Sequence, residues 1–322
     1  MSTYKIIDQT TTQQPTVSVA MLAYNHQEFI SEAIESVLMQ KITFPIQIVI
    51  AEDCSPDNTR AIVLEYQTKY PDIIKLILQD KNVGASQNND ALLNHLDGQY
   101  IAPLEGDDYW IDEYKLQQQV DFLEHNQEYN LVYTDAKYYK QNTGEFDLQR
   151  TNQIKDFSDL LVSNRMFTLT VCLKKEVLDI YRQEDANDLK DLPFGDYSLW
   201  LFASTRGQAK YLPIVSAVYR ILEESASHSK NLEKLVSFEE AVSKCRLYFL
   251  NKYYNGDKKQ LETKLLGAKT RSIIKMSFLY KDEKVFNQYK KDLKYIANYK
   301  YKYYLIYSLA KINFKVFTAI YN

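Results

Sequence analysis

The first third of the chain alternates apolar runs with amphipathic stretches, and this alternation constrains the fold more than any other feature. Each apolar run is four to ten residues long, which is typical of buried strands. Strands that alternate with helices predict a mostly parallel sheet flanked by helices, an α/β fold. The predicted strands are residues 16–25, 46–53, 73–80 and the run from residue 100, and the predicted helices are residues 27–40, 59–70 and a stretch through Ala91.

Polar residues follow each of these predicted strands. In parallel sheets, ligands bind beyond the carboxyl ends of the strands. One polar cluster could stand there by chance, but four in succession favour a binding site. The clusters are Tyr24 with Asn25, then Asp53, then residues 80–82, and then the acids of residues 105–108.

The last of these clusters holds three carboxylates, Glu105, Asp107 and Asp108. One explanation is a solvated turn, in which Gly106 supplies unusual backbone angles and Asp107 caps the next element. The other is a site for a hard divalent cation, which takes oxygen ligands and often bridges substrate phosphates. These residues alone leave both explanations open.

The composition is that of an ordinary soluble globular protein, with 45% hydrophobic and 25% charged residues in 322. Three cysteines far apart in the sequence, Cys54, Cys172 and Cys245, form no zinc or disulfide pattern, which fits a reducing compartment. Residues 1–14 are polar, lack the apolar core of a signal peptide and are expected to form a loose arm. No apolar run is long enough to span a membrane. A cytoplasmic location is expected.

The charges divide the chain into an acidic body and a basic tail. Residues 226–322 carry 20 Lys and Arg against 8 Asp and Glu, whereas the residues before them carry 19 against 34. We expect the tail, residues 229–322, to be a mainly helical region rich in Tyr and Lys. Residues 299–317 fit either a segment in the interface of an anionic membrane or, more commonly, a packed helical subdomain. No nucleic-acid module accompanies the basic charge, so no nucleic-acid partner is expected.

The middle of the chain continues the alternation less regularly. A helix through Leu116 to Leu123 is expected to follow the acidic cluster, and another helix to begin at Asp196. The remaining predicted elements are strands at residues 131–139, 166–175 and from 211, a polar loop at 141–153, a short helix at 156–164 and a flexible closing loop that ends at 229.

Residues 16–110 resemble the nucleotide-sugar half of a family 2 glycosyltransferase, an inverting enzyme with the Rossmann-like GT-A fold. The matching segments, in order, are MLAYN, EDCSPDNT, KNVGASQNN and LEGDDYW. The last resembles the DxD element of the family, with Glu105 where many relatives have Asp. The resemblance covers roughly residues 15–228, which implies a GT-A domain there, and does not include the tail. A GxGxxG phosphate loop is absent, which argues against a dinucleotide enzyme.

The resemblance also implies which residues bind the donor. Ala23 and Tyr24 would flank the nucleoside, Asp53 would accept a hydrogen bond from the base, and Asn82 and Gly84 would lie beside the ribose and diphosphate. From local sequence alone, Asp53 is equally a helix-capping acid and Tyr24 an ordinary aromatic residue at a rim. The full set of expected donor-binding residues is Ala23, Tyr24, Asn25, Asp53, Asn82, Gly84, Glu105, Asp107 and Arg220.

The same resemblance implies a bound Mg²⁺ or Mn²⁺ that neutralises the diphosphate as it leaves. Asp107 and Asp108 would serve the ribose and the metal, without a division of the two tasks between them. Arg220 and His228 stand where relatives often carry an Arg or His close to the donor phosphates and the metal. A lone histidine such as His228 is more often incidental.

Asp196 is the expected catalytic base. In the resembled family this helix opens with an acidic pair whose second member is the base; here Gly195 replaces the first acid and Asp196 keeps the second. A base must remove the proton of the acceptor hydroxyl as its oxygen attacks opposite the leaving diphosphate. The alternative from local sequence is that Asp196 only caps the helix.

The implied activity is transfer of a sugar from a nucleotide-diphosphate sugar, expected to be a UDP-sugar, to a saccharide acceptor. The acceptor is expected to be lipid-linked, in the synthesis of capsule-like or O-antigen-like polysaccharide, with peripheral association on the inner face of the cell membrane. A sugar nucleotidylyltransferase is one alternative, but MLAYNHQEF lacks its Gly-rich, Arg-containing loop. A non-catalytic GT-A-like binding or assembly module is the other, and the intact acids argue against it.

Overall fold

The computed structural model describes residues 4–11, 14–222, 231–297, 301–310, 313–314 and 318. The chain forms two compact units. The first, here called the sheet unit, comprises residues 1–154, 165–188 and 194–223. The second, here called the helical unit, comprises residues 155–164, 189–193 and 224–322.

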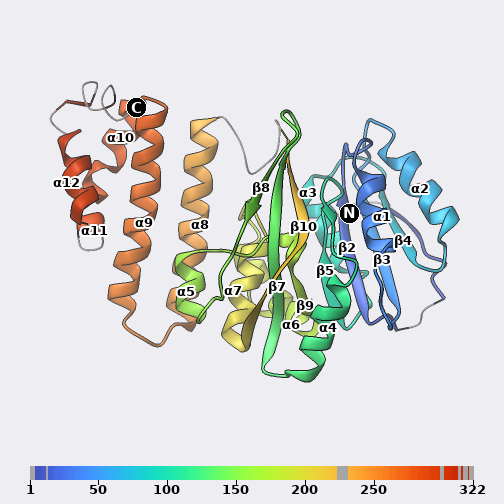
Figure 1. Ribbon diagram of the computed structural model, residues 1–322. Helices are drawn as coiled ribbons and strands as arrows, with labels where there is room; N and C mark the ends of the chain where they lie inside the picture. The colour runs from blue at the N-terminus through green and yellow to red at the C-terminus, as the bar shows by residue number, and fades with distance from the viewer. Residues whose placement is uncertain are drawn as a thin grey trace. The chain divides into compact units, whose positions relative to one another are not determined.

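The sheet unit is built on one mixed sheet, which has ten strands within the described residues (Figure 1). Its order is β1-β4-β3-β2-β5-β9-β7-β10-β6, and β8 pairs with β7. The strands are β1 (Tyr4–Ile7), β2 (Val17–Ala23), β3 (Ile46–Glu52), β4 (Ile74–Gln79), β5 (Tyr100–Pro103), β6 (Tyr109–Trp110), β7 (Tyr129–Lys140), β8 (Glu145–Gln149), β9 (Cys172–Lys174) and β10 (Gln208–Ile221).

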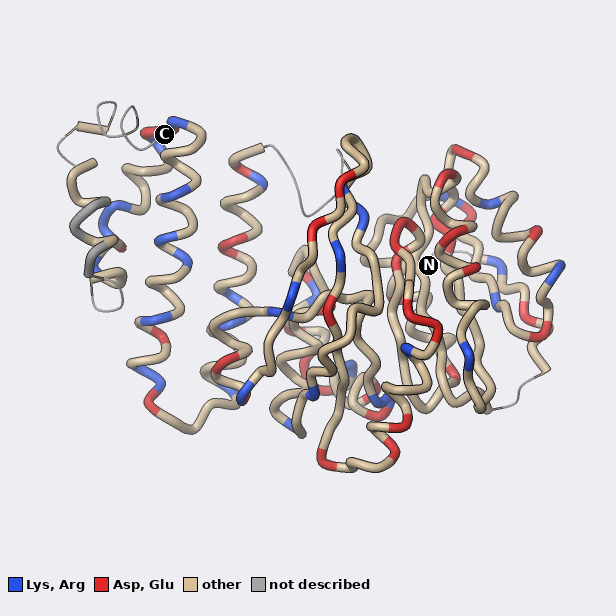
Figure 2. Tube along the Cα trace, in the orientation of Figure 1, with Lys and Arg blue, Asp and Glu red and all other residues tan. Residues whose placement is uncertain are grey.

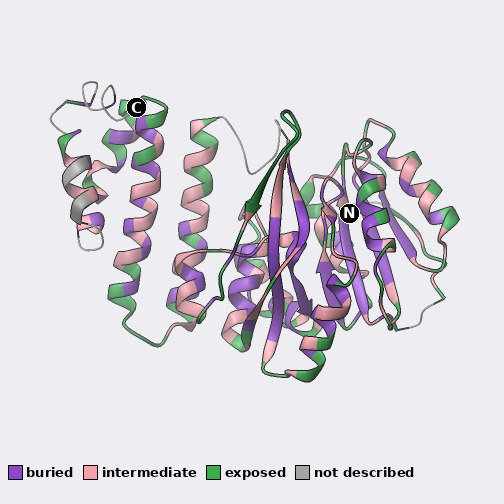
Figure 3. Cartoon of the chain, in the orientation of Figure 1, coloured by how far each residue is buried: buried purple, intermediate pink, exposed green. Residues whose placement is uncertain are grey.

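Parallel pairing joins β4, β3, β2 and β5 in one half of this sheet and β7 with β10 in the other, and β9 pairs antiparallel with β5 and β7 between them. Strand β2 pairs in parallel with β3 and β5, β3 with β4, and β7 with β10. No residue of β2, β3 or β4 is exposed, because helices cover the sheet (Figure 3). A strand that is buried on both faces reads as an unbroken apolar run, which is the pattern in the sequence. The predicted α/β sheet with flanking helices is confirmed, and the sheet as a whole is mixed.

The helices that flank the sheet bury one apolar face each. In α1, Ile30, Ala33, Ile34 and Val37 recur at helical spacing and are all fully buried. The helices of the sheet unit are α1 (Ile30–Leu38), α2 (Thr59–Lys69), α3 (Ala85–Leu93), α4 (Lys115–His125), α6 (Lys175–Glu184) and α7 (Asp196–Arg206).

Three local expectations for this unit need correction. The arm at residues 1–14, expected to be loose, contains β1, which pairs antiparallel with β4. The polar loop predicted at 141–153 contains β8, paired antiparallel with β7. The strand predicted at 166–175 is divided into a 3₁₀ turn, η1 (Thr168–Thr170), and β9. In each case the deciding partner is distant in sequence or the segment is polar, so the local pattern carries little signal.

The helical unit packs around a core of its own. Its helices are α5 (Phe157–Val162), α8 (Leu232–Tyr253), α9 (Lys258–Leu279), α10 (Glu283–Tyr289), α11 (Leu293–Ala297) and α12 (Tyr301–Leu309). Asn231, Asp257 and Asp282 cap α8, α9 and α10, each accepting a backbone N–H three residues on. The core residues are Ile273, Ile274, Phe278, Phe286, Tyr289, Leu293, Ile296, Tyr307, Ala310 and Phe314.

The helical unit extends beyond the predicted tail. It takes in residues 155–164 and 189–193, which were expected in the GT-A domain, because α5 packs against α8 and α9. The predicted boundary at 228 lies outside the described residues. The described part of residues 299–317 packs into the apolar core, as expected of a packed subdomain. Among the described helices, none combines the length and apolar character that crossing a bilayer requires.

Candidate active site

The structure brings the predicted site residues together at one edge of the sheet. Strands β2 to β5 run parallel, so the segments that follow them emerge at the same edge. Ala23 ends β2 and Tyr24, 44% exposed, follows it. Asp53 follows β3, residues 82–84 follow β4, and residues 105–108 follow β5.

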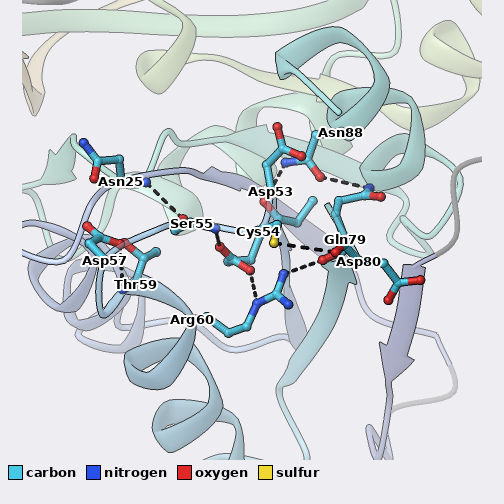
Figure 4. Close-up of polar contacts among 12 residues, drawn as sticks. Asn25, Asp53, Cys54, Ser55, Asp57, Thr59, Arg60, Gln79, Asp80 and Asn88 are labelled. Carbon is cyan, nitrogen blue, oxygen red and sulfur yellow. Dashed lines mark hydrogen bonds and ion pairs between the residues drawn. The ribbon is translucent and has the colours of Figure 1, made fainter. Parts of the chain in front are cut away.

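The segment after β2 is tied to the segment after β3 (Figure 4). The Asn25 N–H donates to Ser55 Oγ at 3.0 Å, and the His26 N–H donates to Thr59 Oγ1 at 2.8 Å. Asn25 has a φ of +58° and Cys54 a φ of +54°, so both segments turn through the left-handed region. Asn25, expected to bind donor, is therefore held in a fixed turn at the strand ends.

Asp53 fixes the segment after β4. It is 3% exposed, and its Oδ1 accepts the Val83 N–H at 2.8 Å while its Oδ2 accepts the Gly84 N–H at 2.9 Å. Asn82 Oδ1 also accepts the Gly84 N–H, at 3.1 Å. Gly84 has a φ of +84°, which favours glycine. Each carboxylate oxygen of Asp53 keeps a second lone pair, which is the acceptor that the predicted hydrogen bond from a base requires.

A buried ion pair lies beneath Asp53. Glu52 is fully buried, and its carboxylate accepts hydrogen bonds from Arg60 Nε and from the Ser55 N–H (Figure 4). Arg60 also donates through Nη2 to the Gln79 carbonyl oxygen at 2.6 Å. This network joins the ends of β3 and β4, and it was not singled out in the sequence because acid-to-Arg spacing across a turn is common.

The acidic segment after β5 concentrates negative charge. Glu105 is half-buried, but its Oε2 is shielded from solvent and has no hydrogen-bond partner. Burial, followed by the charges of Asp107 and Asp196, raises the pKa of Glu105 to about 8. Burial, followed by the charges of Asp107 and Glu105, raises the pKa of Asp108 well above its usual value. The segment is therefore short of positive charge.

Gly106 lets this segment lie directly against His26. Its N–H donates to the Leu22 carbonyl oxygen at 2.9 Å, and a Cβ there would stand 2.7 Å from His26 Nδ1 and from Ile30 Cδ1. His26 Nε2 lies 3.9 Å from Asp107 Oδ1. Burial lowers the pKa of His26, against the raising effect of the Asp107 and Asp57 charges. His26 was missed in the sequence, where its only signal is its place just beyond the first strand.

Arg220 braces the acidic segment from β10. Its backbone N–H donates to Asp108 Oδ1 at 2.7 Å and its Nε to the Asp107 carbonyl oxygen at 2.8 Å. Its guanidinium also donates to Gln141 Oε1 at 3.0 Å and to Glu32 Oε2 at 2.5 Å, and the residue is 6% exposed. Three aromatic rings surround the guanidinium, with their centroids 4.6 to 5.6 Å from its Cζ, and they belong to Phe29, Tyr109 and Tyr139. The guanidinium of Arg220, which was expected near the donor phosphates, also holds the acidic segment in place.

Asp196 opens α7 as its first helical residue, after Gly195 at the N-cap position. Its Oδ2 accepts the Thr168 hydroxyl at 2.7 Å and its Oδ1 accepts the Tyr197 N–H at 2.7 Å. Gly195, which has no side chain, occupies the N-cap position, and Asp196 accepts the N–H of the next residue from within the first turn. The charge of Asp196 contributes to the raised pKa of Glu105, so the start of α7 lies near the acidic segment. His228 lies outside the described residues.

The acidic segment fits a divalent cation whose coordination the phosphates of the donor would complete. Among the described residues, no group of three His, Cys, Asp or Glu side chains is arranged to hold a metal ion by itself. Mg²⁺ and related ions, however, are often held by one or two carboxylates together with water and substrate phosphates. A cation at this place would give Glu105 Oε2, which has no hydrogen-bond partner, a positive partner. It would also reduce the mutual repulsion of the three acids.

Comparisons with known proteins agree with this geometry. The family model described as "Glycosyl transferase family 2" matches residues 18–184. Protein Mb1547 of Mycobacterium bovis, which has no assigned activity, is 30% identical over 220 residues, covering 66% of this chain and 61% of its own length. The chain thus spans about three fifths of that relative.

Two further matches carry names. An Escherichia coli protein named UDP-Glc:alpha-D-GlcNAc-diphosphoundecaprenol beta-1,3-glucosyltransferase WfgD is 29% identical over 221 residues, which is 66% of this chain and 80% of that protein. The crystal structure of S. aureus TarS 1–349 in complex with UDP-GlcNAc matches with a TM-score of 0.65 at 18% identity, covering 88% of this chain and 81% of that one. At that identity the structural match shows the fold.

Proposed function

The chain belongs to glycosyl transferase family 2 and has a GT-A fold, and on that basis we propose that it transfers one sugar from a nucleotide-diphosphate sugar to a saccharide acceptor with inversion. One observation carries the proposal. Asp196, from a helix more than 85 residues beyond the acidic segment, is joined to that segment through the η1 turn. The Trp110 indole donates to the Leu169 carbonyl oxygen, and the Thr168 hydroxyl donates to Asp196 Oδ2. A base on the acceptor side and carboxylates on the donor side are what the reaction needs together.

The donor side comprises the segments after β2 to β5. Tyr24 is exposed at the rim, and Asp53 and the Val83–Gly84 amides form a fixed turn. We assign the nucleoside to Ala23, Tyr24 and Asp53 and the diphosphate to the Asn82–Gly84 segment. A UDP-sugar is the preferred donor class, because the name of WfgD contains one and TarS was crystallised in complex with one.

Asp107 and Asp108 would hold Mg²⁺ or Mn²⁺. When bound, the cation would neutralise charge on the leaving diphosphate. Arg220 contributes by fixing both acids: its side-chain Nε donates to the Asp107 carbonyl oxygen, and its backbone N–H donates to the Asp108 carboxylate.

Asp196 would act as the general base. Its carboxylate must lie within about 3 Å of the acceptor hydroxyl to take the proton while the oxygen attacks the anomeric carbon. The bond from that carbon to the diphosphate breaks on the opposite face, and the electron pair leaves with the diphosphate. The Asp196 carboxylate accepts hydrogen bonds from Thr168 and Tyr197 and none from the turn at Asp53. It can therefore take the proton of the acceptor without binding the donor.

The deciding experiment replaces Asp196 by Asn, which keeps the size and the Thr168 contact but cannot take a proton. Transfer should fall by about 10²–10⁴, whereas donor affinity, measured by calorimetry with Mn²⁺, should stay within twofold. Asp191→Asn, which changes an exposed acid of the preceding loop, is the matched control and should leave both unchanged. Full transfer by Asp196→Asn would refute the assignment of the base. A wild-type protein that binds donor but transfers no sugar would be the non-catalytic module instead.

We further propose a lipid-linked acceptor at the cytoplasmic face of the cell membrane, in surface polysaccharide synthesis. The WfgD name contains a diphosphoundecaprenol acceptor, and the basic excess of residues 226–322 would attract anionic lipid. Sedimentation with anionic vesicles should fall as salt rises, because exposed charges are screened over about 10 Å at 0.1 M salt. Absence of sedimentation at low salt would remove the membrane from the proposal.

A further inference from the structure

We propose that Thr168 is a positioning residue for sugar transfer: its hydroxyl orients the carboxylate of Asp196 toward the acceptor. The inference rests on the proposed function and adds to it a residue from a segment that the sequence placed in a strand. Thr168 begins the 3₁₀ turn η1, which no motif of the donor site includes.

The contact itself is short and charge-assisted. Thr168 Oγ1 donates to Asp196 Oδ2 at 2.7 Å, and the two residues are 28 positions apart in the chain. A neutral donor to a carboxylate makes one of the stronger hydrogen bonds in proteins. Because the other oxygen, Oδ1, accepts the Tyr197 N–H at 2.7 Å, the two contacts together define the plane of the carboxylate.

The turn that carries Thr168 is fixed by buried side chains. The Trp110 indole Nε1 donates to the Leu169 carbonyl oxygen at 2.9 Å, and Gln119 Nε2 donates to the Thr170 carbonyl oxygen at 2.8 Å. Trp110 is 1% exposed and Gln119 is fully buried. Both donors point at the backbone of η1, so the turn has little freedom to move.

The same anchoring links the base to the acidic segment. Trp110 stands two residues after Asp108 and donates to η1, and η1 donates through Thr168 to Asp196. A run of two hydrogen bonds therefore sets the place of the base relative to the carboxylates after β5. A displacement of about 1 Å in a reacting group can cost about 10²-fold in rate, so this link bears directly on catalysis.

Replacement of Thr168 by Val tests the role, because Val keeps the shape and removes the hydroxyl. We expect kcat to fall roughly tenfold to a hundredfold, the size of a lost hydrogen bond to a charged group. The KM for donor and the calorimetric donor affinity should not change, because the donor lies against other segments. Thr168→Ser keeps the hydroxyl and should retain kcat within about threefold.

Thr205→Val is the matched control, near the other end of α7. Its hydroxyl donates to the Phe202 carbonyl oxygen at 2.7 Å and not to an acid, so its loss should leave kcat unchanged. A kcat of Thr168→Val equal to wild type, with Asp196→Asn inactive, would overturn the inference while the proposed function stands. A Thr168→Val variant with weakened donor binding, or a Ser variant as slow as Val, would make the role structural and overturn it too. No transfer by the wild-type protein would refute the proposed function first.

Discussion

The two units of the chain differ in whether they bury charged side chains. Among the described residues, every buried Asp, Glu, Lys or Arg lies in the sheet unit, including Glu52, Asp53, Asp108, Lys115 and Arg220. The core of the helical unit is aliphatic and aromatic, and the charged residues along α8 and α9 lie outside that core (Figure 2).

This difference separates the unit that holds the candidate site from the helical unit, whose described core is apolar. A buried charge destabilises a fold unless it is paired, so it persists where another requirement holds it. In the sheet unit the acids gather beyond β3 and β5, where the substrate would supply the missing partners. The described residues of the helical unit include no buried Asp, Glu, Lys or Arg. We therefore expect this unit to contribute packing and surface charge rather than chemistry.

The largest expected effect on stability comes from breaking a buried ion pair. Arg60→Met leaves the fully buried Glu52 carboxylate without its cation and should lower the free energy of unfolding by about 3–5 kcal/mol. Lys269→Met breaks the Lys269–Glu240 pair of the helical unit, 3.3 Å long with the Glu 43% exposed, and should cost under about 1 kcal/mol. Urea denaturation followed by circular dichroism measures both. Equal losses of unfolding free energy in the two variants would contradict this difference between the two units.

The next effect concerns donor binding at the acidic segment. Asp107→Asn and Asp108→Asn each remove a carboxylate charge from the proposed cation site, and Mn²⁺-dependent donor affinity should fall at least about tenfold. Calorimetry with a UDP-sugar, with and without Mn²⁺, measures it. Glu113→Gln changes an exposed acid that pairs with Lys41 and serves as the control. Unchanged affinity in both Asn variants would mean that these acids do not hold the cation.

The smallest effect is a pH slope from Lys115. Burial lowers the pKa of this fully buried lysine to about 7, against about 10.4 in an unfolded chain. Between these values the unfolded chain binds one more proton, so stability should rise with pH by about 1.4 kcal/mol per unit. Lys115→Met lacks this proton and should lose that slope between pH 7.5 and 9.

Tryptophan fluorescence during urea denaturation measures this slope, because both tryptophans, Trp110 and Trp200, lie in the sheet unit. Parallel slopes for wild type and Lys115→Met would show that Lys115 stays charged in the fold. Lys115 would then be a buried charge, compensated by Gln119 Oε1, 2.8 Å from its Nζ, and by the Trp110 ring 4.2 Å away.

The parallel half of the sheet could be predicted from the amino-acid sequence. Strands β2, β3 and β4 are buried on both faces, so each is an unbroken apolar run that local reading can find, and the polar residues after them mark one edge. The positions of Asp53 and of the acids at 105–108 followed from that order alone. The helical character of the tail was also visible, because its Tyr, Leu and Lys residues recur without strand-like alternation.

Which groups meet depends on tertiary packing. That Asp53 holds the Val83–Gly84 amides, that Arg220 braces Asp107 and Asp108, and that Thr168 holds Asp196 all depend on pairs 28 to 113 residues apart. β1 likewise exists through pairing with the distant strand β4, whereas β8 forms a hairpin with the neighbouring β7 and was missed because the segment is polar. A local sequence pattern reports burial and periodicity, whereas a hydrogen bond between remote side chains depends on how the chain is packed, and no spacing in the sequence encodes it.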